Sequence, residues 1–119
     1  MTVVLDTNVT LYLLGGRLAR PLPLAEYAVS VITEMELLSF PTLTPSEEGA
    51  IRQFLASLKL AELSAEVRGI AIQLRRSQRL KLPDAIVAAT AIELGAELIT
   101  NDGRLAKTPG LRTRSVELR

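Results

Sequence analysis

Short apolar runs alternate with helix-like segments along this chain of 119 residues, and this alternation constrains its fold more than any other feature. Strands that alternate with helices form α/β folds with a mainly parallel sheet. We expect one such domain over residues 1–119, a length that allows a sizeable core. The predicted strands are Val3–Leu5, Ala28–Ile32, Leu58–Leu63, Glu97–Thr100 and Arg112–Leu118, of which the third could equally be a helix end.

Helix signals separate the predicted strands. Thr44, Pro45 and Glu47 have the order of a capping box with proline in the first turn. The segment Asp84–Leu94 is apolar nearly all round, which predicts a buried helix that ends at Gly95. The predicted helices begin at Asp6, Thr33, Thr44, Ser64 and Pro83.

Four acidic residues each follow a strand-like run or lie at a predicted helix start, and each has an ordinary local explanation. Asp6 can cap its helix, and Glu36 can complete a capping box with Thr33. Asp84 suits the positive end of a helix dipole, and Asp102 suits the turn Asn-Asp-Gly.

The joint placement of these four acids indicates chemistry instead. In a parallel α/β sheet, the carboxyl ends of the strands and the helix starts beyond them share one edge. Capping does not predict that four acids share that edge, although Glu36 is the weakest member of the set. Like charges a few ångströms apart repel, and divalent cations supply the counter-charge. The pattern therefore favours a metal-dependent site for phosphoryl transfer or phosphodiester cleavage.

Missing residue types narrow this chemistry. The chain has no cysteine and no histidine, which excludes disulfides, thiolate nucleophiles, imidazole bases and histidine metal ligands. Carboxylate oxygens are hard ligands that suit Mg²⁺ or Mn²⁺. No run approaches the ~20 apolar residues of a membrane span. Asp6 also interrupts any signal-like apolar start, so we expect a cytoplasmic protein with no membrane partner.

The net charge is only +1, but the basic residues are unevenly placed. Arg68, Arg75 and Arg79 are predicted to form a stripe along one helix, which serves either solubility or contact with RNA phosphates. Two groups of cations stand out in the sequence: Arg75, Arg76, Arg79 and Lys81, and then Arg104, Lys107, Arg112, Arg114 and Arg119.

Three segments carry a resemblance to a known family: VVLDTNV, SVITEMELL and LPDAIVAATAIELGAELITND. Over essentially its whole length the chain resembles the PIN-domain nucleases, most closely the compact VapC-type toxins of toxin–antitoxin pairs. The resemblance implies a PIN-like three-layer sandwich, with a mainly parallel five-stranded sheet flanked by helices.

The resemblance also implies roles for single residues. It makes Asp6, Glu36, Asp84 and Asp102 the catalytic residues, and Asp6, Asp84 and Asp102 the ligands of Mg²⁺ or Mn²⁺. Glu36 completes the acidic cluster in this interpretation.

Two further positions match residues that support the acids through hydrogen bonds in the family, namely Asn8 and Thr100. The chain departs from the family in its short segment between Gly15 and Ser30 and in its compact helical region between Glu36 and Asp84. These departures concern the surface for substrate recognition and the dimer interface more than the chemistry.

We expect an endoribonuclease that cleaves RNA phosphodiesters with a water activated by metal, because the chain offers no histidine base. The resemblance also implies two partners, a cognate antitoxin that covers the site and a second copy of the chain.

Two alternative functions stay open. A phosphatase with Asp6 as nucleophile needs Asp-x-Asp, whereas Asn8 holds the second position. The other alternative is a non-catalytic PIN-like module that binds RNA or protein.

Overall fold

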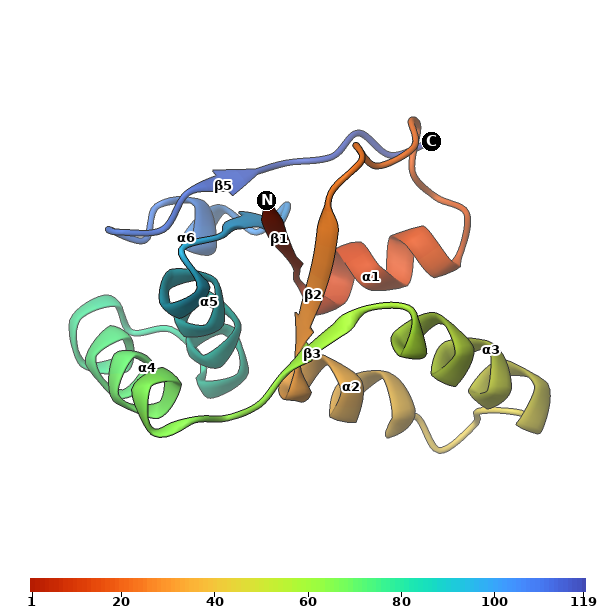
Figure 1. Ribbon diagram of the computed structural model, residues 1–119, viewed down its shortest axis with the longest axis horizontal. Coiled ribbons are helices and arrows are strands. Elements are labelled where there is room, and N and C mark those ends of the chain that lie inside the picture. The colour runs from red at the N-terminus through yellow and green to blue at the C-terminus, as the bar shows by residue number, and fades with distance from the viewer.

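Five parallel strands form a single sheet in the computed structural model, which describes residues 1–119 (Figure 1). The order across the sheet is β3-β2-β1-β4-β5, and every neighbouring pair is parallel. The predicted five-stranded α/β fold is therefore confirmed, with a sheet that is parallel throughout. The strands are β1 (Thr2–Leu5), β2 (Glu26–Ser30), β3 (Lys59–Ala61), β4 (Glu97–Ile99) and β5 (Thr113–Arg114).

Helices cover both faces of the sheet and give the fold three layers (Figure 1). On one face α5 packs on the strands through Val4, Ala28 and Leu98, with α4 packed against α5. The opposite face, with Val3 and Val29, packs against apolar side chains of α1 and α3. The helices are α1 (Thr7–Leu14), α2 (Val31–Leu38), α3 (Pro45–Ala56), α4 (Ala65–Gln78), α5 (Leu82–Leu94) and α6 (Gly103–Ala106).

The start of α2 differs from the prediction. Strand β2 ends at Ser30, whose side chain accepts a hydrogen bond from the Ile32 N–H and caps α2. Thr33 therefore lies inside α2, fully buried, and the predicted capping box between Thr33 and Glu36 is wrong. Both Ser30 and Thr33 are plausible caps by residue type, and tertiary packing decides between them.

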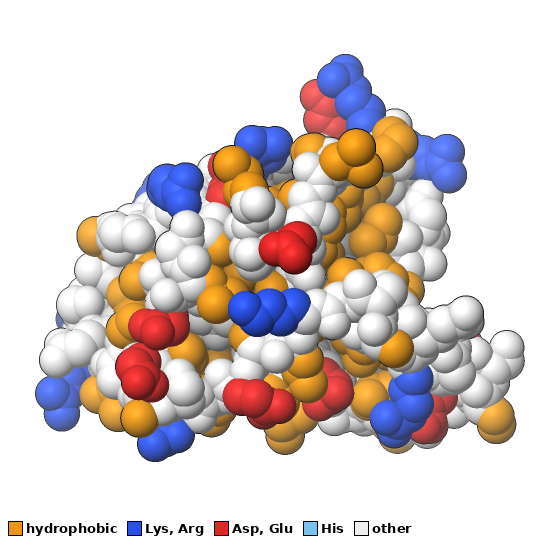
Figure 2. Space-filling view, in the orientation of Figure 1, with side chains coloured by type: hydrophobic (Ala, Val, Ile, Leu, Met, Phe, Trp, Pro, Cys, Tyr) orange, Lys and Arg blue, Asp and Glu red, His pale blue; other side chains and the backbone are white.

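The last strand is shorter than predicted. Only Thr113–Arg114 pairs with β4, although the alternating pattern extends to Leu118. The residues beyond turn to the connection after α1, where Leu118 forms an antiparallel bridge with Leu18. None of the helices combines the length and the hydrophobicity that a membrane span requires. The face in Figure 2 mixes apolar, acidic and basic side chains, in keeping with the small net charge.

Candidate functional site

Asp6 directly follows β1 and caps α1 at the carboxyl edge of the sheet. Its Oδ1 accepts a hydrogen bond of 2.7 Å from the Val9 N–H, and its Oδ2 accepts one from the Thr100 hydroxyl. The carboxyl is buried, and this burial raises its pKa above the ordinary value. The hydrogen bonds from Thr100 and Val9 oppose that rise, whereas the nearby charges of Asp102 and Glu36 add to it.

Thr100 ties Asp6 to the loop that carries Asp102. Its hydroxyl donates to Asp6 and accepts a 3.0 Å hydrogen bond from the Asp102 N–H. The expected hydrogen bond from Thr100 to the acids is thus present. Asn8 also borders the acids, but its side chain makes no hydrogen bond to them, contrary to expectation.

Asp102 is a helix cap rather than a simple turn residue. Its Oδ1 accepts hydrogen bonds from the N–H groups of Arg104 at 2.8 Å and Leu105 at 3.4 Å, at the start of α6. The preceding residue anchors the same loop, because the Asn101 amide donates to the Val116 carbonyl and accepts from the Val116 N–H. Asp102 therefore sits on a loop held at both ends.

Glu36 reaches the site from α2 through two threonines that sequence reasoning missed as site residues. The Thr7 hydroxyl donates to Glu36 Oε1 at 2.7 Å, and the oxygens of Thr7 and Thr33 lie 3.0 Å apart. Because Thr7 gives its only hydroxyl proton to Glu36, Thr33 is the donor to Thr7. The only sequence signal that could have identified these threonines as site residues is the position of Thr7 directly after Asp6.

Asp84 lies in the first turn of α5 and is half-buried. Its carboxylate accepts no hydrogen bond from the protein. Burial, then the charges of Asp102, Glu36 and Asp6, raise its pKa, and only the charge of Lys81 lowers it. Asp84 is the only one of the four acids whose carboxylate receives no hydrogen bond from the protein.

All four acids border one cavity of about 100 Å³. We call it the acidic hollow, and its lining residues are Asp6, Thr7, Asn8, Glu36, Asp84, Val87 and Asp102. None of the four acids forms an ion pair, since the salt bridges of the protein lie elsewhere. The predicted gathering of the four acids at one edge is therefore present.

The acidic hollow fits a hard divalent cation by its donors. Its polar side chains offer oxygen and amide groups only, and Asp84 brings a carboxylate that no protein donor satisfies. The acids are not pre-assembled, because no three of them form a group that could hold a metal ion as they stand. Binding would therefore need side-chain rotation, for which the unbonded Asp84 has the most freedom.

Comparison with known proteins identifies the family. The family model of the PIN domain matches residues 3–111. No curated protein matches the chain significantly. Among solved structures, a chain of a toxin–antitoxin complex from Klebsiella pneumoniae is 32% identical, with a TM-score of 0.76 over 92% of this chain and 94% of that one.

Two further structures match in fold at lower identity. VapBC2 from Rickettsia felis, bound to a promoter DNA fragment, gives a TM-score of 0.82 at 21% identity over 98% of this chain and 100% of that one. DNA-bound VapBC from Salmonella typhimurium gives 0.83 at 20% identity over 97% and 98%. The chain therefore belongs to the PIN-domain family, and its structural matches include VapC toxins of VapBC toxin–antitoxin complexes.

Proposed function

We propose that this protein is a metal-dependent endoribonuclease and the toxin of a toxin–antitoxin pair, acting on RNA in the cytoplasm. The observation that carries the proposal is the acidic hollow, which four carboxylates border without a cationic side chain in ion-pair contact. A purely structural cluster would gain stability from such a partner, because unpaired carboxylates repel one another. Membership of the PIN-domain family supports the same proposal.

In this proposal Asp6, Asp84 and Asp102 hold Mg²⁺ or Mn²⁺, and Glu36 completes the set. When bound, the ion neutralises charge on the phosphate and makes water a stronger nucleophile. Thr100 and the Val9 N–H fix the Asp6 carboxylate in one orientation. Thr7 occupies Oε1 of Glu36, which leaves Oε2 able to accept a proton from the attacking water. No 2′-hydroxyl is needed as nucleophile, so the product would carry a 5′-phosphate.

Cleavage of a pool of end-labelled RNAs tests the proposal. We expect cleavage with Mg²⁺, none with EDTA, and products that carry a 5′-phosphate and a 3′-hydroxyl. Cyclic 2′,3′-phosphate ends, or equal cleavage in EDTA, would contradict the proposed chemistry. Folded protein that binds Mg²⁺ and RNA but cleaves none of the pool would favour the non-catalytic alternative.

Replacing Thr33 by Val is expected to lower kcat about 10-fold with little change in KM, because Glu36 loses the relay that orients it. Valine keeps the shape of the buried side chain. Thr90→Val is the matched control, since Thr90 is also buried in a helix but its hydroxyl bonds only the Ile86 carbonyl of the same helix. Steady-state kinetics of both variants check the prediction, and equal kcat for the two would contradict it.

A cognate antitoxin is the proposed protein partner, because related chains were crystallised in toxin–antitoxin complexes. An apolar groove of about 400 Å³ lies between α1, the α2–α3 connection and α3. Leu11, Leu14, Phe40, Leu43 and Ile51 line it, and Leu14 and Phe40 are partly exposed. We propose that an apolar helix of the antitoxin fills this groove, and that the protein also pairs with itself.

Arginine in place of Leu14 is expected to weaken antitoxin binding at least 10-fold, because it puts a charge into an apolar groove. RNA cleavage by the free protein should stay within two-fold of wild type. Calorimetry with the co-encoded antitoxin measures the affinity, with Leu24→Arg as control, since Leu24 is fully exposed outside the groove. Wild-type affinity for Leu14→Arg would exclude the groove as the docking site.

Light scattering of the free protein tests whether the protein pairs with itself. A monomeric mass at every concentration would contradict the proposed pairing.

A further inference from the structure

The cations in the last turn of α4 and on the connection to α5 are free, whereas many other cations of the protein are engaged. The exposed side chains of Arg75, Arg76, Arg79 and Lys81 form no ion pair and no hydrogen bond. Several other guanidinium groups are tied to backbone carbonyls or to a carboxylate. These engaged residues are Arg68 on Leu63, Arg112 on Gly95, Arg119 on Gly16 and Arg114 on Glu97.

The predicted stripe of Arg68, Arg75 and Arg79 therefore does not survive as a unit. Arg68 is held by the Leu63 carbonyl at 2.8 Å, and Arg79 leaves the helix as the C-cap of α4. The free charge lies in the last turn of α4, with Arg75 and Arg76, and on the connection that leads into α5 and its Asp84.

Lys81 occupies a position that helix physics disfavours. It is the N-cap of α5, and it is the only helix N-cap of the protein whose side chain makes no capping hydrogen bond. A cation there also faces the positive end of the helix dipole. N-cap and third-position side chains are neighbours, so Lys81 lies beside Asp84, whose pKa it lowers without forming an ion pair.

Arg79 breaks a second local preference. Its φ of 55° makes it the only non-glycine residue in the left-handed region, at a helix end where glycine is usual. Between the two cations, buried Leu80 anchors the connection in the core. Both side chains are thus exposed on one short connection, with Lys81 beside Asp84 and Arg79 two residues before it, at positions where a smaller neutral residue would be more stable.

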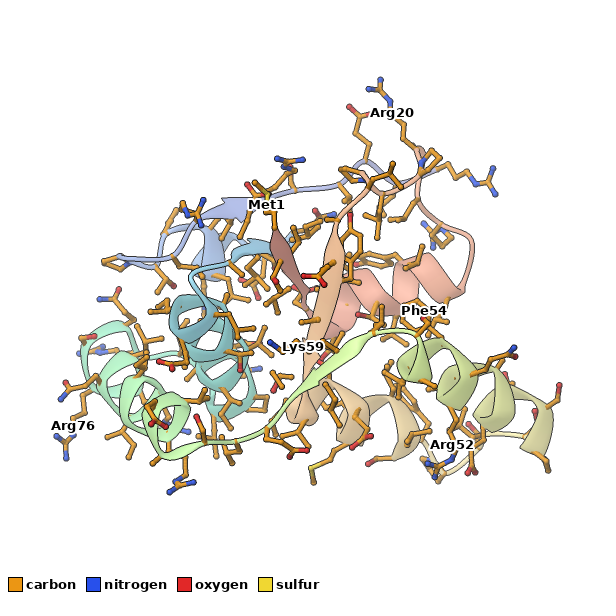
Figure 3. The ribbon with its side chains drawn as sticks, in the orientation of Figure 1. Met1, Arg20, Arg52, Phe54, Lys59 and Arg76 are labelled. Atoms are coloured by element: carbon orange, nitrogen blue, oxygen red, sulfur yellow. The ribbon has the colours of Figure 1, made fainter.

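We propose that Arg79 and Lys81 form a phosphate-contacting surface that holds the RNA backbone beside Asp84. The inference rests on the proposed nuclease function and identifies how its substrate is held. The side-chain charges would bind the backbone without regard to base sequence. Arg76 projects outward from α4 and Arg20 lies at the opposite end of the molecule (Figure 3), so neither belongs to this surface.

Fluorescence anisotropy with a labelled single-stranded RNA pool, in an Asp6→Asn background that prevents cleavage, tests the surface. Lys81→Ser and Arg79→Gly are each expected to weaken binding about five-fold at 0.1 M salt and to lower the salt slope by about 0.7. The same variants should raise Tm by a few degrees, because serine caps α5 and glycine accepts the left-handed backbone. Weaker binding by a more stable protein cannot result from misfolding.

Arg20→Ser is the matched control and should bind RNA as the Asp6→Asn parent does. Equal affinities for Lys81→Ser, Arg79→Gly and Arg20→Ser would overturn the inference, and cleavage by wild type would still leave the nuclease proposal standing. If wild type neither binds nor cleaves RNA, both proposals fall. Polyglutamate is the probe for an acidic protein partner. If Lys81→Ser and Arg79→Gly lose polyglutamate binding but bind RNA as the parent does, the inference is overturned and the surface is assigned to an acidic protein partner.

Discussion

Asparagine in place of Asp6 is expected to slow Mg²⁺-dependent RNA cleavage by about 10³-fold while the protein stays folded. Asparagine caps helices as well as aspartate does, so the Val9 N–H keeps an acceptor. The lost group is the most buried carboxylate of the acidic hollow, and Thr100 and Val9 hold it in one orientation. Single-turnover rates at fixed Mg²⁺, with circular dichroism as a check on folding, measure the effect.

The matched control for this loss is Glu93→Gln, which removes an exposed acid on α5 outside the acidic hollow. We expect this variant to cleave within two-fold of wild type. Wild-type cleavage by folded Asp6→Asn would contradict the assignment of the site. A similar loss in Glu93→Gln would show that net charge, rather than the acidic hollow, governs the rate.

Asp84→Asn is expected to lose cleavage to a similar extent and, unlike most substitutions, to stabilise the metal-free protein. Burial and three neighbouring carboxylates raise the pKa of Asp84 above its ordinary value of 3.8. Between the ordinary pKa of the unfolded state and the higher pKa of the folded state, the folded protein therefore binds more protons than the unfolded protein. The free energy of unfolding falls as pH rises through the folded-state pKa. Asparagine carries no charge, so it removes this cost at neutral pH.

Thermal unfolding in EDTA and in Mg²⁺ checks both parts of this prediction. At pH 7 in EDTA, Asp84→Asn should melt a few degrees above wild type, and the difference should vanish below about pH 4. Added Mg²⁺ should raise the Tm of wild type more than that of Asp84→Asn, because the ion binds only the folded state. A lower Tm for Asp84→Asn in EDTA, with Glu93→Gln unchanged, would contradict the account.

Sequence reasoning found the four acids because their signals are local. Asp6 follows a buried apolar run, and Asp84 follows Pro83 at the start of an apolar helix. In a parallel sheet these two positions necessarily face the same edge, so the placement follows from element order alone. The gathering of Asp6 and Asp84 was accordingly predictable from residue type and the order of strands and helices, whereas Glu36 lies inside α2 and not at its start.

The supporting contacts were less accessible to sequence reasoning. The relay from Thr33 through Thr7 to Glu36 joins residues 26 and 29 positions apart, and no local pattern specifies which hydroxyl meets which carboxylate. The strand predicted at Arg112–Leu118 split for a similar reason. Its distal part pairs with the connection after α1, where the Ala19 N–H donates to the Glu117 carbonyl.

Crystals grown with Mn²⁺ and measured at its absorption edge would test the central claim most directly. The account predicts an anomalous peak in the acidic hollow, in contact with carboxylate oxygens of Asp6, Asp84 and Asp102, and no such peak in crystals of Asp6→Asn. Crystals grown at saturating Mn²⁺ that show no anomalous peak in the acidic hollow would contradict a metal-dependent site. The four acids would then be helix caps and turn residues that happen to share one edge of the sheet.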